Sequence, residues 1–170
     1  PEEFLGYLQT EFEPAETDFP FLIELAHYEY AELALSVSEA ETDMTGVDPD
    51  GDLLQSVPVK SALAWAFAYH YPVHRIAPDF LPTEAEAAPT YLALYRDGED
   101  NVGFLELNAV TAALLEDIEN NSAQLCGEAL LRQLAEKINY PDADALVEHG
   151  AAALREMRQL DILAGTRSPT

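Results

Sequence analysis

Positively charged residues are scarce in this sequence. Its 170 residues include 32 Asp and Glu but only 8 Lys and Arg, which gives a formal net charge of −24. No Lys or Arg precedes Lys60, whereas 15 acidic residues do. Proteins bind nucleic acid mainly through Lys and Arg that displace counterions from phosphates, so nucleic acid is an unfavourable partner here. We interpret the acidity as a solvated surface suited to a salty environment rather than as a means of steering a basic partner.

Cysteine and long apolar runs are also missing. The single cysteine, Cys126, excludes an internal disulfide, and its place in a helical pattern indicates a buried thiol. No apolar run reaches the roughly 20 residues that span a bilayer, and no signal-peptide pattern is present. We therefore expect a soluble, cytoplasmic protein with no membrane partner. Because the chain begins at Pro1 rather than methionine, we also expect that an upstream part was removed or lies in another segment.

Catalytic motifs are absent as well. The sequence contains no G-x-S-x-G, no Walker lysine motif, no G-x-G-x-x-G and no H-E-x-x-H. His70 and His74 lie four residues apart, but Pro72 separates them and no further ligands follow at metal-site spacing. A catalytic pair chosen from 32 carboxylates has almost no specificity. The sequence predicts no enzyme, no metal site and no cofactor.

The stretch LAWAFAYHYPVHRI, residues 63–76, has a strictly alternating pattern. Large side chains occupy the odd positions from Leu63 to Tyr71, and alanine or histidine occupies the even ones. This period of two predicts a strand with one face of rings and one face of methyl groups. The methyl face would let a helix approach closely. Which face packs against helices stays open at this point.

Residues 90–96 and 102–107 predict a hairpin joined by the turn DGEDN, in which Gly98 is available for a positive φ. Asn108 is expected to cap a helix that runs to about Glu119, and further helices are expected over about 124–138 and 143–160. The predicted fold class is α+β, with a small antiparallel sheet (strand plus hairpin) and three C-terminal helices on one face.

The pattern of the N-terminal part predicts helices. Residues 2–12 carry an apolar stripe at helical spacing, and a second helix is expected from Asp18 to about Val37. On that helix we interpret His27 as a surface histidine paired with Glu24 and Glu32. Gly and Pro among many acids mark the following segment as a linker. We therefore divide the chain into the end of an N-terminal helical domain (1–40), an acidic linker (41–56) and an α+β C-terminal domain (57–170).

Two polar features admit more than one interpretation. Arg96 ends a strand, where it could form a hairpin ion pair with Asp97 or Asp100, or contact a ligand. The three final helices, which end in LREMRQLDILAG, are similar to a helix-turn-helix followed by a short strand. Few basic side chains accompany them, which is a weak basis for DNA recognition.

Four segments together resemble the HvfC family of bacterial proteins that mature ribosomally made peptide natural products. They are PFLIELAHYEYAELAL (20–35), YHYPVHRI (69–76), YLALYRDGEDNVGFLELN (91–108) and the closing LREMRQLDILAG. The resemblance implies a two-domain protein whose N-terminal domain has carried the label of a DNA-binding domain. It also implies that the chain contains the end of that domain and the whole C-terminal domain.

The resemblance further implies an accessory role similar to that of the methanobactin accessory subunit. Such a subunit pairs with a multinuclear non-haem iron oxidase, helps present the precursor peptide and leaves the iron ligands to its partner. A peptide can add a strand to an open sheet edge, so our own candidates for peptide or partner contact lie on the sheet: Trp65, Tyr71, Tyr91, Tyr95, Arg96 and Phe104. The alternatives are a DNA-binding regulator that uses the terminal helices, and an oligomerisation domain that uses the aromatic face of residues 63–71.

Overall fold

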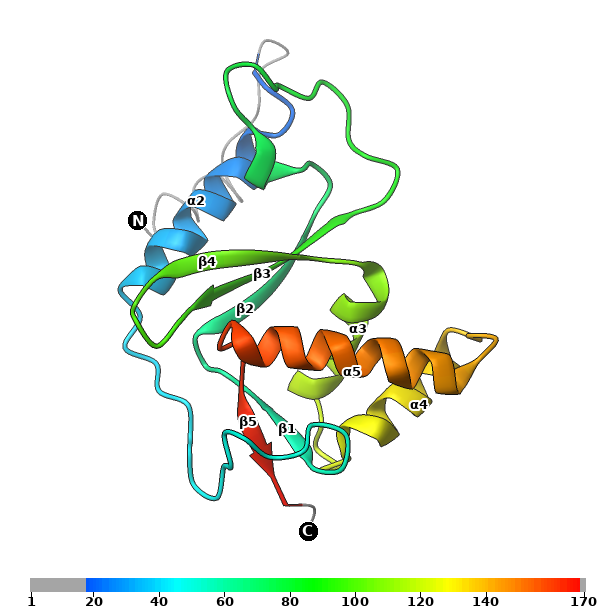
Figure 1. Cartoon of the computed structure of the whole chain (residues 1–170). Helices are drawn as coiled ribbons and strands as arrows, with labels where there is room; N and C mark the ends of the chain where they lie inside the picture. The colour runs from blue at the N-terminus through cyan, green and yellow to red at the C-terminus, as the bar shows by residue number, and fades with distance from the viewer. Residues whose placement is uncertain (1–17, 169–170) are drawn as a thin grey trace.

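The computed structural model describes residues 18–168, which form helices around two small antiparallel sheets (Figure 1). The predicted helix over residues 2–12 lies outside this range. In chain order the elements are α2 (Leu22–Ser36), β1 (Val57–Lys60), β2 (Ala64–Tyr69), the 3-10 turn η1 (Val73–Arg75), β3 (Thr90–Arg96), β4 (Val102–Leu107), α3 (Ala109–Glu119), α4 (Gly127–Lys137), α5 (Ala143–Gln159) and β5 (Leu163–Arg167). The α+β class is confirmed.

The central sheet has the strand order β2-β3-β4, so the predicted strand and hairpin lie side by side. Its register pairs Ala66 with Ala93 and Ala93 with Leu105, which puts all three side chains on one face. The same register puts Phe67 and Leu92 on the opposite face. The alternating pattern of residues 63–71 therefore separates two different packing surfaces.

Helix α2 covers the ring face of the sheet. Tyr28, Ala31 and Leu35 of α2 are buried in one apolar cluster with Leu92 and Leu94 of β3. Rings of β2, including Trp65 and Phe67, pack against this cluster. Both faces of the sheet are therefore covered, because the helix assigned to the N-terminal segment takes the face opposite the three C-terminal helices (Figure 1).

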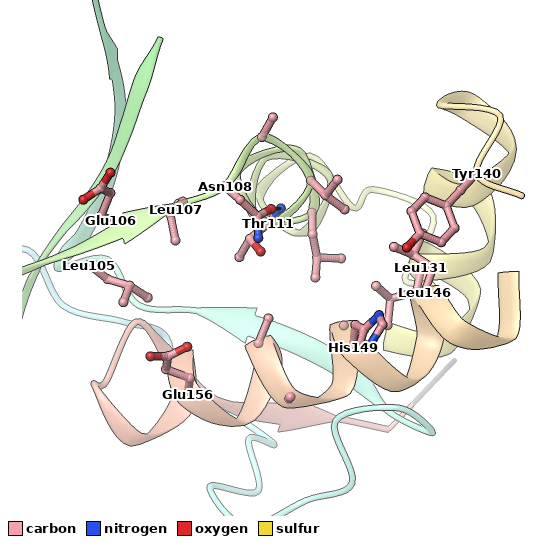
Figure 2. A pocket seen from close by; sticks show the side chains of 16 residues that line it. Leu105, Glu106, Leu107, Asn108, Thr111, Leu131, Tyr140, Leu146, His149 and Glu156 are labelled. Atoms are coloured by element: carbon pink, nitrogen blue, oxygen red, sulfur yellow. Dashed lines mark hydrogen bonds between the residues drawn. The ribbon is translucent and has the colours of Figure 1, made fainter. Parts of the chain in front are cut away.

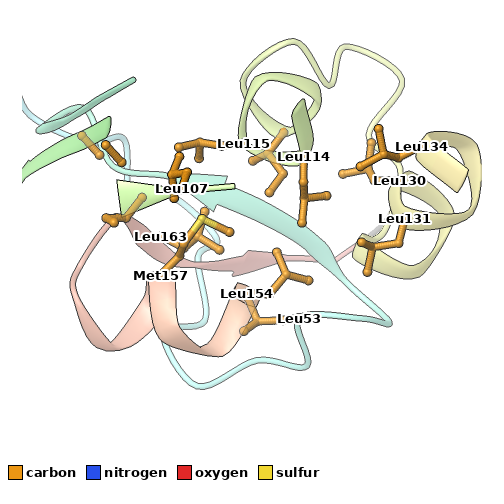
Figure 3. Packing of buried hydrophobic residues seen from close by; sticks show 14 of the residues in the cluster. Leu53, Leu107, Leu114, Leu115, Leu130, Leu131, Leu134, Leu154, Met157 and Leu163 are labelled. Carbon is orange, nitrogen blue, oxygen red and sulfur yellow. The ribbon is translucent and has the colours of Figure 1, made fainter. Parts of the chain in front are cut away.

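The methyl face belongs to the second and larger core, which the three C-terminal helices close. Ala64 and Ala93 of the sheet belong to this cluster. Figure 3 shows its buried leucines from α3, α4 and α5. Among its most buried members are Leu131, Leu134 and Leu154, each at 0% exposure. Small side chains on the sheet allow this close helix packing, as the pattern predicted.

A second sheet, β1 with β5, was not predicted. It pairs Val57 with Arg167 and Val59 with Gly165, so residues more than 100 positions apart become neighbours. The segment assigned as a linker also contacts β5, because Asp48 and Thr166 form an isolated β-bridge. Sequence periodicity does not reveal such pairings because four or five residues carry too little pattern.

The hairpin turn differs from its prediction in one detail. Asp100 adopts the positive φ, at 64°, whereas Gly98 is not among the positive-φ residues. Aspartate tolerates this conformation better than most residues. The helix cap, by contrast, is confirmed: the Asn108 side chain accepts a hydrogen bond from the N–H of Thr111 at 2.8 Å.

Within residues 18–168, no helix is both long and apolar enough to cross a membrane.

Candidate functional site

The outer edge of β4 is the first component of the candidate site. Asp97 N–H donates to the carbonyl of Asn101 at 3.0 Å. Asp97 and Asn101 are therefore a hydrogen-bonded pair that continues the β3–β4 ladder. Because such pairs alternate along antiparallel strands, the main-chain groups of Val102, Phe104 and Glu106 point away from β3. No other described residue pairs with them. The edge is therefore open for an added strand.

A cavity of about 760 Å³ lies beside this edge (Figure 2). It opens between the end of β4, the start of α3 and the exposed flank of α5. Most of its lining is apolar: Leu105, Leu107, Ala109, Val110, Leu114, Leu131, Leu146, Gly150, Ala152 and Ala153. A cavity of this size and character suits apolar side chains of a ligand.

Polar groups lie at the two ends of this cavity. Glu106 and Glu156 lie towards the end formed by Leu105, and Tyr140 and His149 lie towards the other end (Figure 2). Metal binding has no support in the described range 18–168, where no group of three His, Cys, Asp or Glu side chains comes close enough to hold an ion. The arrangement can bind a ligand by burial and charge.

The six predicted contact residues do not converge on one site. Tyr91 and Tyr95 share the face of Ala93, towards the C-terminal helices, and both pack against the larger core. Tyr91 also lines a second groove, on the β2 side of α3. Neither tyrosine borders the large cavity directly.

The other predicted residues belong to the α2 face. Trp65 and Tyr71 pack against the cluster that α2 closes, and the Tyr71 ring lies 6.3 Å from that of Phe21. Phe104 is 42% exposed at the open edge of β4, with its ring 5.3 Å from that of His74. Of these three, Phe104 is the one placed where an added strand would lie.

Arg96 anchors the end of α2. Its Nη1 donates to the carbonyls of Leu35 and Ser36 at 3.1 and 2.9 Å, and its Nη2 donates to that of Ser38 at 2.8 Å. The expected ion pair with Asp100 is also present, at 3.6 Å. The guanidinium satisfies carbonyls that a helix C-terminus leaves without partners. Arg96 therefore ties α2 to the hairpin and is not free for a ligand.

Sequence reasoning missed the α5 residues that line the cavity. Leu146, Gly150, Leu154 and Met157 form the buried stripe of α5, and the neighbouring flank, with His149 and Ala153, borders the cavity. The helical period identifies the stripe. It does not reveal that the adjacent flank faces an open space, because that depends on where α3 and β4 end.

Another partly buried group, His27, lies between α2 and the ring face. Its Nδ1 is 2.9 Å from the Tyr69 hydroxyl, and its ring packs edge-on against Phe67. Its expected partners, Glu24 and Glu32, form their hydrogen bonds with other side chains, so the predicted pairing is wrong. Burial lowers the pKa of His27 below its ordinary value of 6.5, although Glu24 acts in the opposite direction.

This lowered pKa predicts a loss of stability in mild acid. The unfolded chain binds a proton at His27 near pH 6.5, whereas the folded protein binds it only at lower pH. The free energy of unfolding should therefore decrease as the pH falls below about 6.5. Urea unfolding at a series of pH values between 8 and 5 measures this free energy. His27→Gln should show a flatter profile than the wild type, and equal slopes for the two proteins would contradict the assignment.

Comparison with known proteins bears on this architecture. The sequence model of the HvfC C-terminal domain matches residues 61–158, more than half of the chain. The match includes the whole β2-β3-β4 sheet, α3, α4 and nearly all of α5. The comparison with curated proteins found no match. The sheet and the helices that form the cavity are therefore those of a recognised domain, and the chain belongs to the HvfC family.

Proposed function

We propose that this protein is a non-catalytic accessory protein that binds a ribosomally made precursor peptide at the edge of β4. The family assignment supports an accessory type of protein. The observation that carries the proposal is the open edge of Val102, Phe104 and Glu106 beside an apolar cavity. Main-chain hydrogen bonds to such an edge provide affinity, and pockets for alternate side chains provide specificity.

The register of β4 determines which peptide side chains would enter the cavity. Leu105 and Leu107 project towards the cavity, whereas Phe104 and Glu106 project to the opposite face. In an added strand, residues next to Leu105 and Leu107 lie on the same face as those leucines. The proposed peptide therefore carries apolar side chains two positions apart.

Charge supports a basic peptide. The protein has a formal net charge of −24, and Glu156 lines the cavity. The Glu106 carboxylate lies on the opposite face of the sheet, 3.3 Å from Nε2 of His74. Complementary charge accelerates association and disfavours acidic competitors. We expect Lys or Arg in the peptide next to its apolar positions.

A partner enzyme would perform the chemistry. The family resemblance points to a multinuclear non-haem iron oxidase that modifies cysteines of the precursor while this protein holds the rest of the peptide. The metal ligands would then all belong to the oxidase. Helix α2 lies on the side of the sheet away from the cavity, so it leaves the β4 edge and the cavity accessible to the peptide.

A DNA-binding role has weaker support. Arg132 pairs with Glu128 and Asp144 at 2.9 and 3.0 Å, and Lys137 pairs with Asp117 at 3.3 Å. A guanidinium or ammonium already paired with carboxylates releases few counterions from phosphates.

Co-expression tests the proposed function. The full-length protein would be produced with the iron oxidase and the short cysteine-containing peptide encoded in its gene neighbourhood. Purification through this protein should retain both, and peptide modification should require all three. Binding of neither would refute the proposal, and retention of duplex DNA at physiological salt would favour the regulator instead.

A proline at the β4 edge should weaken peptide binding specifically. The N–H of Phe104 points outward, so Phe104→Pro removes a donor for the added strand but no β3–β4 hydrogen bond. We expect about tenfold weaker binding of the precursor by calorimetry, since one hydrogen bond is lost and the edge is obstructed. Phe104→Thr keeps the N–H and serves as the control. Equal losses in both variants would show that the ring, and not strand pairing, matters.

A further inference from the structure

The opposite edge of the same sheet, on β2, is also open. Arg96 N–H donates to the carbonyl of Leu63 at 3.0 Å, which identifies a hydrogen-bonded pair. By the same alternation, the main-chain groups of Ala66 and Ala68 point away from β3. Both are exposed, and within residues 18–168 neither main chain has a partner on that side.

This edge lacks the features that normally prevent strand pairing. Natural edge strands carry a charge, a proline or a bulge. The β1–β5 sheet follows this rule, since β1 contains Pro58 and a register irregularity at Val59/Lys60. Strand β2 reads AWAFAY, with no charge, no proline and a regular register throughout. An unprotected apolar edge of this kind is suited to pairing with another chain.

A groove of about 440 Å³ runs beside the β2 edge. Ala66 and Ala68 form its sheet wall, and Ala112 and Ala113 of α3 form its helix wall. Methyl groups on both walls leave space that larger side chains would fill. Side chains of an added strand that lie on the same face as Ala66 and Ala68 would occupy this space.

The acidic side chains of the groove favour a positively charged occupant over a second copy of this chain. Glu116 and Glu119 line it, and no Lys or Arg does. Lys60 pairs with Glu119 at 2.7 Å, whereas Glu116 is exposed. A second copy of the chain would bring another net charge of −24 to this edge. An extended segment with Lys or Arg gains attraction instead.

We propose that the β2 edge is a second strand-docking site, which binds an extended, positively charged segment of a partner protein. It is separate from the β4 edge proposed for the precursor peptide, and it does not depend on that assignment. The two edges of one three-stranded sheet would then hold two different polypeptides at once.

Trp65, the sole tryptophan, lies next to Ala66 and supplies the signal for a test. Two synthetic peptides, KVTVTVK and EVTVTVE with blocked termini, would be titrated against the full-length protein while tryptophan emission is recorded. We expect KVTVTVK to change the emission saturably and EVTVTVE to bind at least about tenfold more weakly. Equal binding of the two peptides, or binding of neither, would overturn the proposal.

Variants locate the site. Ala66→Pro removes an outward N–H without breaking the β2–β3 ladder, and Ala112→Leu fills the groove from α3 without altering the strand. Both should weaken KVTVTVK about tenfold, whereas Phe104→Pro should leave it unchanged. The proposal is wrong if Phe104→Pro alone weakens binding. It is also wrong if light scattering shows a wild-type dimer that Ala66→Pro dissociates, because the occupant is then a second copy.

Binding of the precursor peptide to the two proline variants distinguishes the β2 edge from the β4 edge. Precursor binding that survives Ala66→Pro but not Phe104→Pro supports separate sites on the two edges. Loss of precursor binding in Ala66→Pro alone would move the precursor to β2 and overturn the assignment of that edge to a partner protein.

Discussion

Replacing Arg96 by alanine is expected to lower the free energy of unfolding by about 2–3 kcal/mol, since hydrogen bonds to charged groups contribute more than neutral ones. The Arg96 side chain is 14% exposed and donates to three carbonyls at the end of α2. Its loss leaves these carbonyls without donors and detaches the helix terminus from the hairpin. Chemical denaturation measures the effect, and hydrogen exchange should show faster opening of α2.

Two variants make this prediction specific. Arg96→Lys keeps the charge but not the planar arrangement of donors, so it should recover only part of the stability. Arg132→Ala removes an arginine that is 46% exposed and paired with Glu128, and should change the stability little, because exposed ion pairs contribute little. If Arg96→Ala were no more damaging than Arg132→Ala, the anchoring role would be refuted.

Replacing Gly127 by alanine should be comparably damaging. Gly127 is the buried first residue of α4, and a Cβ there would overlap the main-chain oxygen of Leu53. The overlap would displace the loop that caps the helix, where Ser56 and Leu54 carbonyls accept the N–H groups of Gly127 and Glu128 at 3.2 and 3.0 Å. We expect a loss of about 2–3 kcal/mol and a melting temperature lower by about 5–10 °C.

The matched control is Gly98→Ala in the hairpin turn. A Cβ at Gly98 would meet only Asp161 Oδ2, at 3.6 Å, which is ordinary contact. This variant should melt within about 2 °C of wild type, because surface changes of this kind alter stability little. A melting temperature for Gly127→Ala within that same range would show that the Leu53 loop yields without cost.

Predictions that depend on adjacent residues were confirmed, whereas features that depend on residues far apart in the chain were missed or wrongly predicted. The hairpin and the Asn108 cap were predicted because each depends on a few adjacent residues. The β1–β5 sheet was missed because its strands are short and far apart in the chain. The pairing of His27 with its helical neighbours was wrong because Tyr69, a residue of another element, lies at 2.9 Å.

The sequence does not reveal the surroundings of the candidate site. Of the residues predicted on the hairpin, Phe104 lies at the open edge of β4. Arg96 instead binds the end of α2, and Tyr91 and Tyr95 pack against the larger core. Proximity along a strand does not reveal which side chains the tertiary structure has already engaged. The cavity depends on elements from three parts of the chain, β4, α3 and α5.

The sequence alone determined the sign of the surface charge, the two-faced β2 strand and the α+β class, because these follow from composition and from periods of two and 3.6 residues. The tertiary structure decided which face each helix covers, which polar groups Arg96 satisfies and which sheet edges stay open. Those features depend on contacts between residues far apart in sequence, and local patterns carry no information about where distant elements end.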